Sequence, residues 1–123
     1  MTVDTNILIP YLNREQDIVR FLDETRMQGV SLILPATVEA EFLSFPLWTF
    51  DQRRTMERFL EENFVFVSLD RPIARLAARI RIHSKIQFAD ATIAATALFT
   101  NTPLATRNIR DFKNVHGLQL VTL

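Results

Sequence analysis

Along the chain, short runs of apolar residues alternate with longer stretches in which apolar positions recur with the period of a helix. The short runs predict buried strands at Met1–Asp4, Val30–Leu34, Phe64–Leu69, Pro103–Thr106 and Leu118–Leu123. The longer stretches predict helices over Arg14–Gln28, Pro35–Phe45, Leu47–Asn63, the residues after Asp70, and Ala89–Thr100, with a turn or short helix over Asn108–Phe112. Strands that alternate with helices in this way indicate a parallel sheet covered on both faces.

Several helix boundaries are marked by residues that suit helix ends. Pro35 stands in the first turn of the second predicted helix, and Pro46 ends that helix. Asp70 is a good N-cap for the helix after it, which carries Pro72 in its first turn. The boundaries therefore agree with the periodicity.

Composition narrows the class of protein. The chain has 123 residues, of which 48% are hydrophobic and 23% charged, and this predicts one globular domain with its own core. The absence of cysteine excludes disulfides, thiolate catalysis and Cys-ligated zinc, and two histidines argue against a His-rich metal site. The start has no signal-peptide pattern, and no stretch reaches the roughly 18 apolar residues of a membrane span. We therefore expect a cytoplasmic protein without a membrane partner.

Charge is balanced overall but uneven along the chain. Residues 1–70 carry 12 acids and 6 bases, whereas residues 71–123 carry 2 acids and 8 bases. A basic half of the surface would suit a polyanionic partner such as nucleic acid, although solvated helices can also differ in charge without a functional reason.

Four acids fall where a ligand site of a parallel α/β sheet is expected, beyond the carboxyl ends of the strands. Asp4 ends the first predicted strand, and Asp111 follows the strand Pro103–Thr106. Glu41 lies in the helix after the second strand, and Asp90 begins a helix made almost only of small and apolar residues. Three have structural alternatives: Asp4 as a helix cap, Asp90 as a favourable charge at a helix start, and Asp111 as a turn residue.

Together, these acids predict a metal site. Carboxylates that converge in one cleft repel each other and raise each other's pKa values, and a divalent cation relieves that repulsion. Hard oxygen ligands without His or Cys favour Mg²⁺ or Mn²⁺ over zinc. In the second predicted helix we assign Glu41 to this site and expect Glu39, two positions away, to be a solvated surface acid.

Five segments resemble the PIN-domain family, and within it the VapC-like toxins. They are VDTNILI (Val3–Ile9), TVEAEF (Thr37–Phe42), FADATIAATAL (Phe88–Leu98), ATRNIRDF (Ala105–Phe112) and GLQLV (Gly117–Val121). The resemblance implies a single PIN-like nuclease domain over residues 1–123, folded as a three-layer α/β/α sandwich with a central, mostly parallel sheet. Only three residues precede Asp4, fewer than is usual in the family, so a true start upstream of Met1 stays open.

The resemblance also implies an activity, the Mg²⁺-dependent hydrolysis of RNA phosphodiester bonds, in which Mn²⁺ can substitute. The family's acidic positions carry over onto Asp4, Glu41, Asp90 and Asp111. Asp4 and Asp90 are expected to bind the metal directly, with Asp111 as a further metal-site residue. Glu41 and Asp111 would position a metal-bound water or hold a second ion.

Other residues are expected to support the site. Polar support should come from Asn6, Thr106 and Asn108. Expected RNA contacts are Arg107, Arg110 and Lys113. Four more basic residues have two possible roles. Either they contact RNA as well, or they form a solvated helix face: Arg75, Arg79, Arg81 and Lys85.

Two other classes of protein fit parts of this pattern. A haloacid-dehalogenase-like phosphatase also uses an aspartate after an N-terminal strand, but it needs a second Asp two residues on, where this chain has Asn6. A catalytically silent PIN-like module that binds RNA or protein is the other alternative. The retention of all four acids argues against it.

We also expect a homodimer that binds a VapB-like antitoxin, in part because the resemblance implies both. The segment Phe42–Phe50 carries four aromatic residues around a proline, namely Phe42, Phe45, Trp48 and Phe50. A short helical junction cannot turn four rings toward one core, so some should form an exposed patch, which is typical of partner sites. The alternative is a satellite core under the helix Leu47–Asn63.

Overall fold

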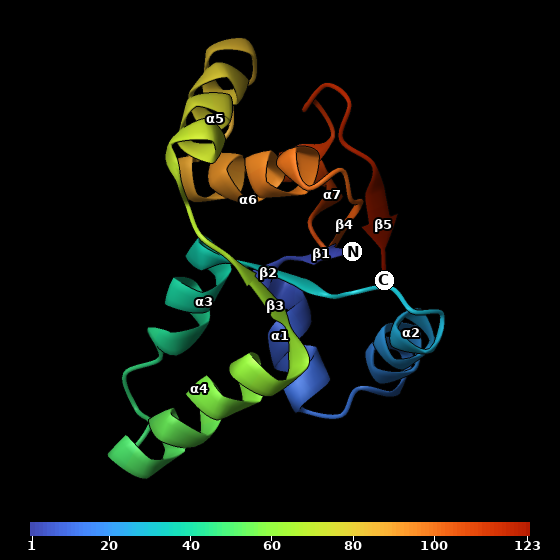
Figure 1. Ribbon diagram of the computed structural model, residues 1–123, viewed down its shortest axis with the longest axis vertical. Coiled ribbons are helices and arrows are strands. Elements are labelled where there is room, and N and C mark those ends of the chain that lie inside the picture. Colours follow the sequence, from blue (N-terminus) through green and yellow to red (C-terminus); the bar gives the residue numbers. More distant parts are fainter.

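The computed structural model describes residues 1–123 and contains a five-stranded sheet between layers of helices (Figure 1). The strands are β1 (Thr2–Val3), β2 (Ile33–Pro35), β3 (Val65–Val67), β4 (Leu104–Thr106) and β5 (Leu120–Thr122). All are parallel, in the order β3-β2-β1-β4-β5, so the first strand of the chain lies at the centre. The predicted α/β/α sandwich with a central parallel sheet is confirmed.

Seven helices surround this sheet. They are α1 (Thr5–Leu12), α2 (Gln16–Met27), α3 (Ala36–Leu43), α4 (Phe50–Asn63), α5 (Arg71–His83), α6 (Phe88–Phe99) and the short α7 (Ile109–Phe112). Figure 1 places α5 and α6 on one side of the strands, and α1, α2 and α4 on the other. None of the helices combines the length and the apolar character that a membrane crossing needs.

Most helices begin and end within two residues of the prediction, but α1 and α4 differ more. Helix α1 was foreseen only through the alternative that Asp4 caps a helix, because its residues are apolar almost throughout and include Pro10, which hides the helical period. Helix α4 begins at Phe50 rather than Leu47, because Thr49 forms a capping box with Gln52. Local capping therefore sets where α4 begins.

Helix α6 is the most buried helix, as its small apolar residues predict. All seven residues of 91–97 are buried, and the same helix packs closely against α5. Its two buried threonines are satisfied within the helix, since the Thr92 hydroxyl donates to the Ala89 carbonyl at 2.7 Å and the Thr96 hydroxyl to the Thr92 carbonyl at 2.8 Å. A helix buried in this way brings its first turn, with Asp90, close to the sheet.

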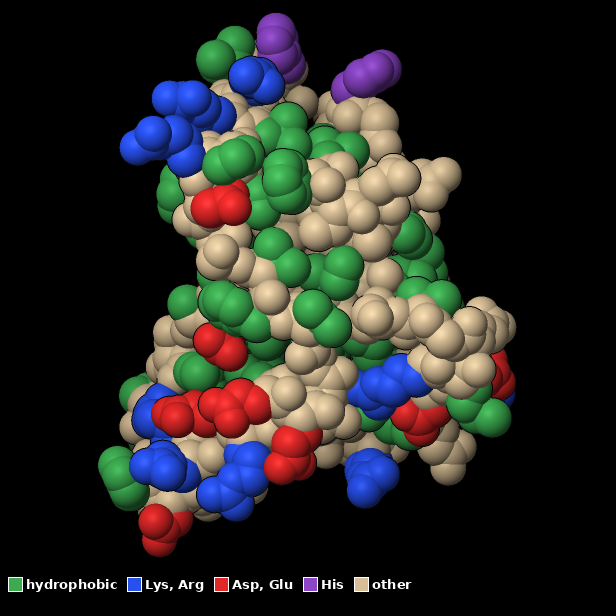
Figure 2. All heavy atoms as spheres, viewed as in Figure 1, with side chains coloured by type: hydrophobic (Ala, Val, Ile, Leu, Met, Phe, Trp, Pro, Cys, Tyr) green, Lys and Arg blue, Asp and Glu red, His purple; other side chains and the backbone are tan.

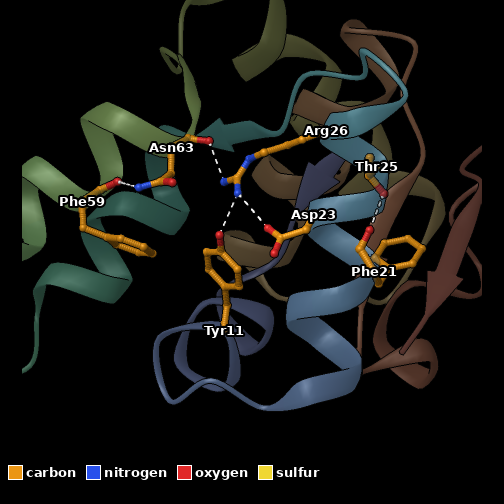
Figure 3. A network of polar contacts seen from close by, with 7 residues as sticks. All are labelled: Tyr11, Phe21, Asp23, Thr25, Arg26, Phe59 and Asn63. Atoms are coloured by element: carbon orange, nitrogen blue, oxygen red, sulfur yellow. Dashed lines mark hydrogen bonds and ion pairs between the residues drawn. The ribbon is translucent and has the colours of Figure 1, made fainter.

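A polar network around Arg26 connects α1, α2 and the end of α4 (Figure 3). The guanidinium donates to the Tyr11 hydroxyl at 2.7 Å, to the Asn63 carbonyl oxygen at 3.0 Å and to an Asp23 carboxylate oxygen at 3.4 Å. Its central carbon also lies 5.5 Å from the centre of the Tyr11 ring and 5.7 Å from that of Phe64. One cation therefore joins three helices through hydrogen bonds and aromatic contacts.

Candidate functional site

Four acids approach one another at the carboxyl end of the sheet. Asp4 follows β1, Glu41 lies in α3 after β2, Asp90 lies in the first turn of α6, and Asp111 lies in α7 after β4. The pKa of Asp90 is raised to about 6, first by burial and then by the negative charges of Asp4, Asp111 and Glu41. All four predicted acids are therefore close enough to influence the protonation of one carboxyl group.

Asp4 is buried, with 6% of its surface exposed. One carboxylate oxygen accepts the Thr5 N–H at 2.7 Å, and the other accepts the Thr106 hydroxyl at 2.8 Å. Burial raises the pKa of this carboxyl, the two hydrogen bonds oppose the rise, and the charges of Glu41 and Asp111 add to it. The predicted helix cap is confirmed, and it holds the carboxylate beside the other acids.

The two glutamates of α3 lie in different surroundings. The Thr5 hydroxyl donates to a carboxylate oxygen of Glu41 at 2.7 Å, which connects this acid to the residue after Asp4. Burial raises the pKa of Glu39, and the charges of Glu61 and Glu57 on α4 add to the rise. The expectation of a solvated Glu39 was wrong, because α3 packs against α4 there and leaves Glu39 half-buried, whereas Glu41 is exposed.

The three polar residues predicted to support the site form one chain of hydrogen bonds. The buried Thr106 hydroxyl, which donates to Asp4, accepts the Asn6 side-chain amide at 3.4 Å and the Asn108 backbone N–H at 2.9 Å. The Asn108 side-chain amide in turn donates to a carboxylate oxygen of Asp111. This chain fixes Asp4 and Asp111 relative to each other.

The predicted RNA-binding residues differ in their surroundings. Arg107 forms an ion pair with Glu15, and its backbone N–H donates to the Asn6 side-chain oxygen at 3.1 Å. Lys113 is exposed directly after α7. Arg107 is thus already engaged with a carboxylate that lies outside the four-acid group.

A cavity of about 470 Å³ adjoins the acids on the side of α5. Asp90 and Asp111 line it together with three cationic side chains, those of Arg81, Lys85 and Arg110. Figure 2 shows Lys and Arg side chains at both ends of the molecule, whereas most of the visible Asp and Glu side chains lie over the end away from α5. Of the residues whose role the sequence left open, the fold brings Arg81 and Lys85 to the site.

Thr5 was missing from the predicted site residues, although it bonds to both Asp4 and Glu41. Its position directly after Asp4 was the available signal. Since a helix was not firmly predicted there, its hydroxyl could not be assigned a direction. The contact with Glu41 joins residues 36 positions apart, and such contacts are set by the fold.

The donor set suits a hard divalent cation. The acids and the side chains hydrogen-bonded to them offer carboxylate, hydroxyl and amide groups, and the charges of neighbouring acids add to the rise in the pKa values of Asp4 and Asp90, which is the repulsion that a cation relieves. No group of three or more Asp, Glu, His or Cys side chains lies close enough to hold an ion by itself. Mg²⁺ retains several waters and binds through one or two carboxylates, so it does not require three side chains within direct reach.

Comparisons with known proteins agree with this arrangement. The PIN-domain family model matches residues 1–118. The chain is similar to a chain of VapBC2 from Rickettsia felis bound to a DNA fragment from their promoter, with a TM-score of 0.85 and 19% identity over 99% of this chain and 97% of that chain. For FitAcB from Neisseria gonorrhoeae the values are 0.76 and 26%, over 97% and 94%. A toxin–antitoxin complex from Klebsiella pneumoniae gives 0.75 and 24%, over 98% and 95%. No curated protein sequence matches significantly.

With its family model spanning nearly the whole chain and its acids gathered at the carboxyl end of a parallel sheet, the chain belongs to the PIN-domain family.

Proposed function

We propose that the protein is a Mg²⁺-dependent endoribonuclease of the cytoplasm and the toxin of a VapBC-like toxin–antitoxin pair, with Mn²⁺ able to replace Mg²⁺. Membership of the PIN-domain family and the likeness to toxin–antitoxin structures support this class of protein. The observation that carries the proposal is the group of four acids whose charges raise the pKa of Asp90. Such a group is costly unless it binds a cation.

The chain's own residues supply the binding and positioning. Asp4 and Asp90 would hold the ion, with Asp111 beside them. When bound, the ion would polarise the scissile phosphate and help to deprotonate a water. The Thr106 hydroxyl keeps Asp4 in place, and Glu41, held by Thr5 and exposed to solvent, is placed to orient the attacking water.

Cleavage of labelled single-stranded RNA tests this proposal. We expect cleavage with Mg²⁺ or Mn²⁺ and none in excess EDTA, and Asp4→Asn or Asp90→Asn should slow it by about 100-fold or more. The variants should keep the circular dichroism spectrum of the wild type. Full activity in EDTA, or a wild-type rate for Asp90→Asn, would contradict the proposal. RNA binding without cleavage under every metal condition would instead indicate a silent binding module.

Helix α3 offers a matched control pair. Glu41→Gln should reduce cleavage by at least roughly tenfold, because it removes a charge that acts on Asp90. Glu39→Gln is the same substitution two positions away, on an acid whose charged neighbours lie on α4. It should cleave RNA like the wild type. Equal effects of the two substitutions would show that Glu41 has been assigned to the wrong site.

We also propose that the exposed aromatic residues after α3 contact a partner. Phe45 and Phe50 are 46% and 74% exposed, as the predicted patch requires, and Leu47 between them is 80% exposed. Phe42 is buried, and Trp48 packs edge-on against it with ring centres 5.4 Å apart. Phe45 also packs edge-on against Trp48, with ring centres 5.4 Å apart, so the exposed rings adjoin a partly buried aromatic cluster.

A VapB-like antitoxin with an apolar helix would suit this patch, and we propose that the toxin itself is a homodimer. A short reading frame directly upstream of the gene should encode the antitoxin. Co-expression should give a complex that Phe50→Ser weakens, and light scattering after size exclusion should give the mass of a dimer for the toxin alone. A monomer at micromolar concentration would remove the homodimer, and a complex unaffected by Phe50→Ser would remove the docking surface.

A further inference from the structure

Arg81 lies between two cavities of different character. On one side is the cavity of about 470 Å³ that contains Asp90 and Asp111 together with Lys85 and Arg110. On the other is a cavity of about 140 Å³ between α5 and α6, lined mainly by Leu69, three alanines of α5 and the ring of Phe88. A cavity lined by cationic side chains, which suits a phosphate, and a cavity that suits an apolar ring therefore meet at Arg81.

Phe88 is exposed in a helix that is otherwise the most buried of the fold. It is the first residue of α6 and is 60% exposed, whereas residues 91–97 of the same helix are all buried. The central carbon of the Arg81 guanidinium lies 5.9 Å from the centre of its ring. Exposed aromatic rings and guanidinium planes are the surfaces on which proteins stack unpaired RNA bases.

We propose that Phe88 and Arg81 form a stacking site for one base of the RNA next to the scissile phosphate, while Lys85 and Arg110 contact the neighbouring phosphates. This inference rests on the proposed ribonuclease function and identifies the part of the site that holds the substrate. Arg81 lines both the cavity that contains Phe88 and the one that contains Asp90 and Asp111, so a base stacked on the Phe88 ring lies next to the acid cavity.

The occupant that fits best is a single strand of RNA. Three cationic side chains around the acid site favour a polyanion, and only a single strand has bases free to stack on protein. The smaller cavity suits one flat ring, because a peptide helix with its side chains is about 10 Å wide.

The experiment measures binding to two labelled strands of equal length by fluorescence anisotropy, in EDTA so that neither is cut. One strand is oligouridine RNA, and the other is its abasic counterpart, which keeps the phosphates and lacks the bases. We expect Phe88→Leu to weaken binding of the RNA roughly tenfold, as expected for loss of one stacked base, and to leave binding of the abasic strand unchanged. Phe88→Trp should retain the binding of the wild type.

Two further variants test the cause. Arg81→Lys keeps the charge but loses the planar guanidinium, so it should also weaken binding of the RNA and not of the abasic strand. Phe99→Leu makes the same substitution at the other end of α6, where the ring is 53% exposed, and should bind both strands like the wild type.

The outcomes separate this inference from the proposed function. If Phe88→Leu and Arg81→Lys bind RNA like the wild type, the stacking site is wrong even if the protein cleaves RNA, and the exposed ring is left to a protein partner. Equal losses on both strands would also overturn it, because they indicate lost charge or lost folding. Base-dependent binding through Phe88 without any cleavage in Mg²⁺ would support the stacking site and overturn the nuclease.

Discussion

The Arg26 network and the acidic edge of the sheet are both polar clusters assembled from several helices, but their charges are balanced differently. Arg26 faces a hydroxyl, a carbonyl and one carboxylate, all of which accept its hydrogen bonds. At the sheet edge, burial and the charges of three other acids raise the pKa of Asp90, and no hydrogen bond to a cationic side chain offsets them. The first cluster stabilises the fold, whereas repulsion in the second costs stability, which on the proposed function a bound cation would restore. The two clusters therefore differ in whether neighbouring groups balance the charge at their centre: they do for Arg26 and do not for Asp90.

The largest effect on stability is expected for Arg26→Met. This substitution leaves the Asn63 carbonyl and the Tyr11 hydroxyl without their partner, so the free energy of unfolding should fall by about 2 kcal/mol. For a chain of this size the melting temperature should fall by about 8 °C. Arg20→Met is the matched control, since Arg20 is exposed on the same helix, and it should have little effect. Equal melting temperatures for the two variants would show that the network is not structural.

The next effect is stabilisation by metal. At a Mg²⁺ concentration about ten times Kd, binding to the folded state alone should add about 1.4 kcal/mol to the free energy of unfolding. Asp90→Asn should lose most of this gain, while Arg26→Met should keep it, because its network lies apart from the acids. Thermal melting in a Mg²⁺ titration measures both. A gain of equal size in Asp90→Asn would place the ion elsewhere.

Without metal, Asp90→Asn should itself be more stable than the wild type. Removing one of four repelling charges should raise the free energy of unfolding by about 1 kcal/mol, a value reduced from that implied by the pKa because Asp90 is only partly buried. Chemical denaturation in EDTA measures this, with the exposed Glu62→Gln as control. A clear loss of stability would mean that the favourable interaction of Asp90 with the start of α6 outweighs the repulsion.

The smallest effect expected is on the pH dependence of stability in EDTA. The pKa of Asp90 rises from 3.8 to about 6 on folding, so between these pH values the folded state binds more protons than the unfolded state. This contribution to stability is therefore present at low pH and is lost as the pH rises through about 6. Asp90→Asn should flatten that part of the curve. An identical curve for the variant would show that Asp90 does not titrate in this range.

Much of the fold was predictable, because strands and amphipathic helices carry their period in the sequence. Helix α5 is an example: Ile73, Ala77 and Ile80, which recur with the period of a helix, are buried. Helix α1 was not firmly predicted, since a helix covered on several sides loses the polar face that reveals it. The positions of the four acids were predictable for the same reason. Each acid is placed by the strand that it follows or the helix in which it lies, and these elements could be predicted from their period.

Contacts between residues far apart in the chain could not be predicted from the sequence. The helical period cannot show that Glu39 meets α4 while Glu41 meets Thr5, because both contacts depend on how α3 is placed between α1 and α4. In the same way, nothing local distinguishes Arg81 from Arg75 on α5. Only the approach of α7 gives Arg81 a cavity shared with Asp111.

The central position of β1 has a consequence for the order in which the protein is made. β1 is the first strand to be synthesised, yet one of its two neighbours is β4, and the Thr106 hydroxyl that holds Asp4 comes from a residue 102 positions later. A growing polypeptide therefore carries Asp4 long before it has the strand that orients this side chain. Asp4 and Asp111 are therefore fixed relative to each other only after β4 and α7 have been synthesised.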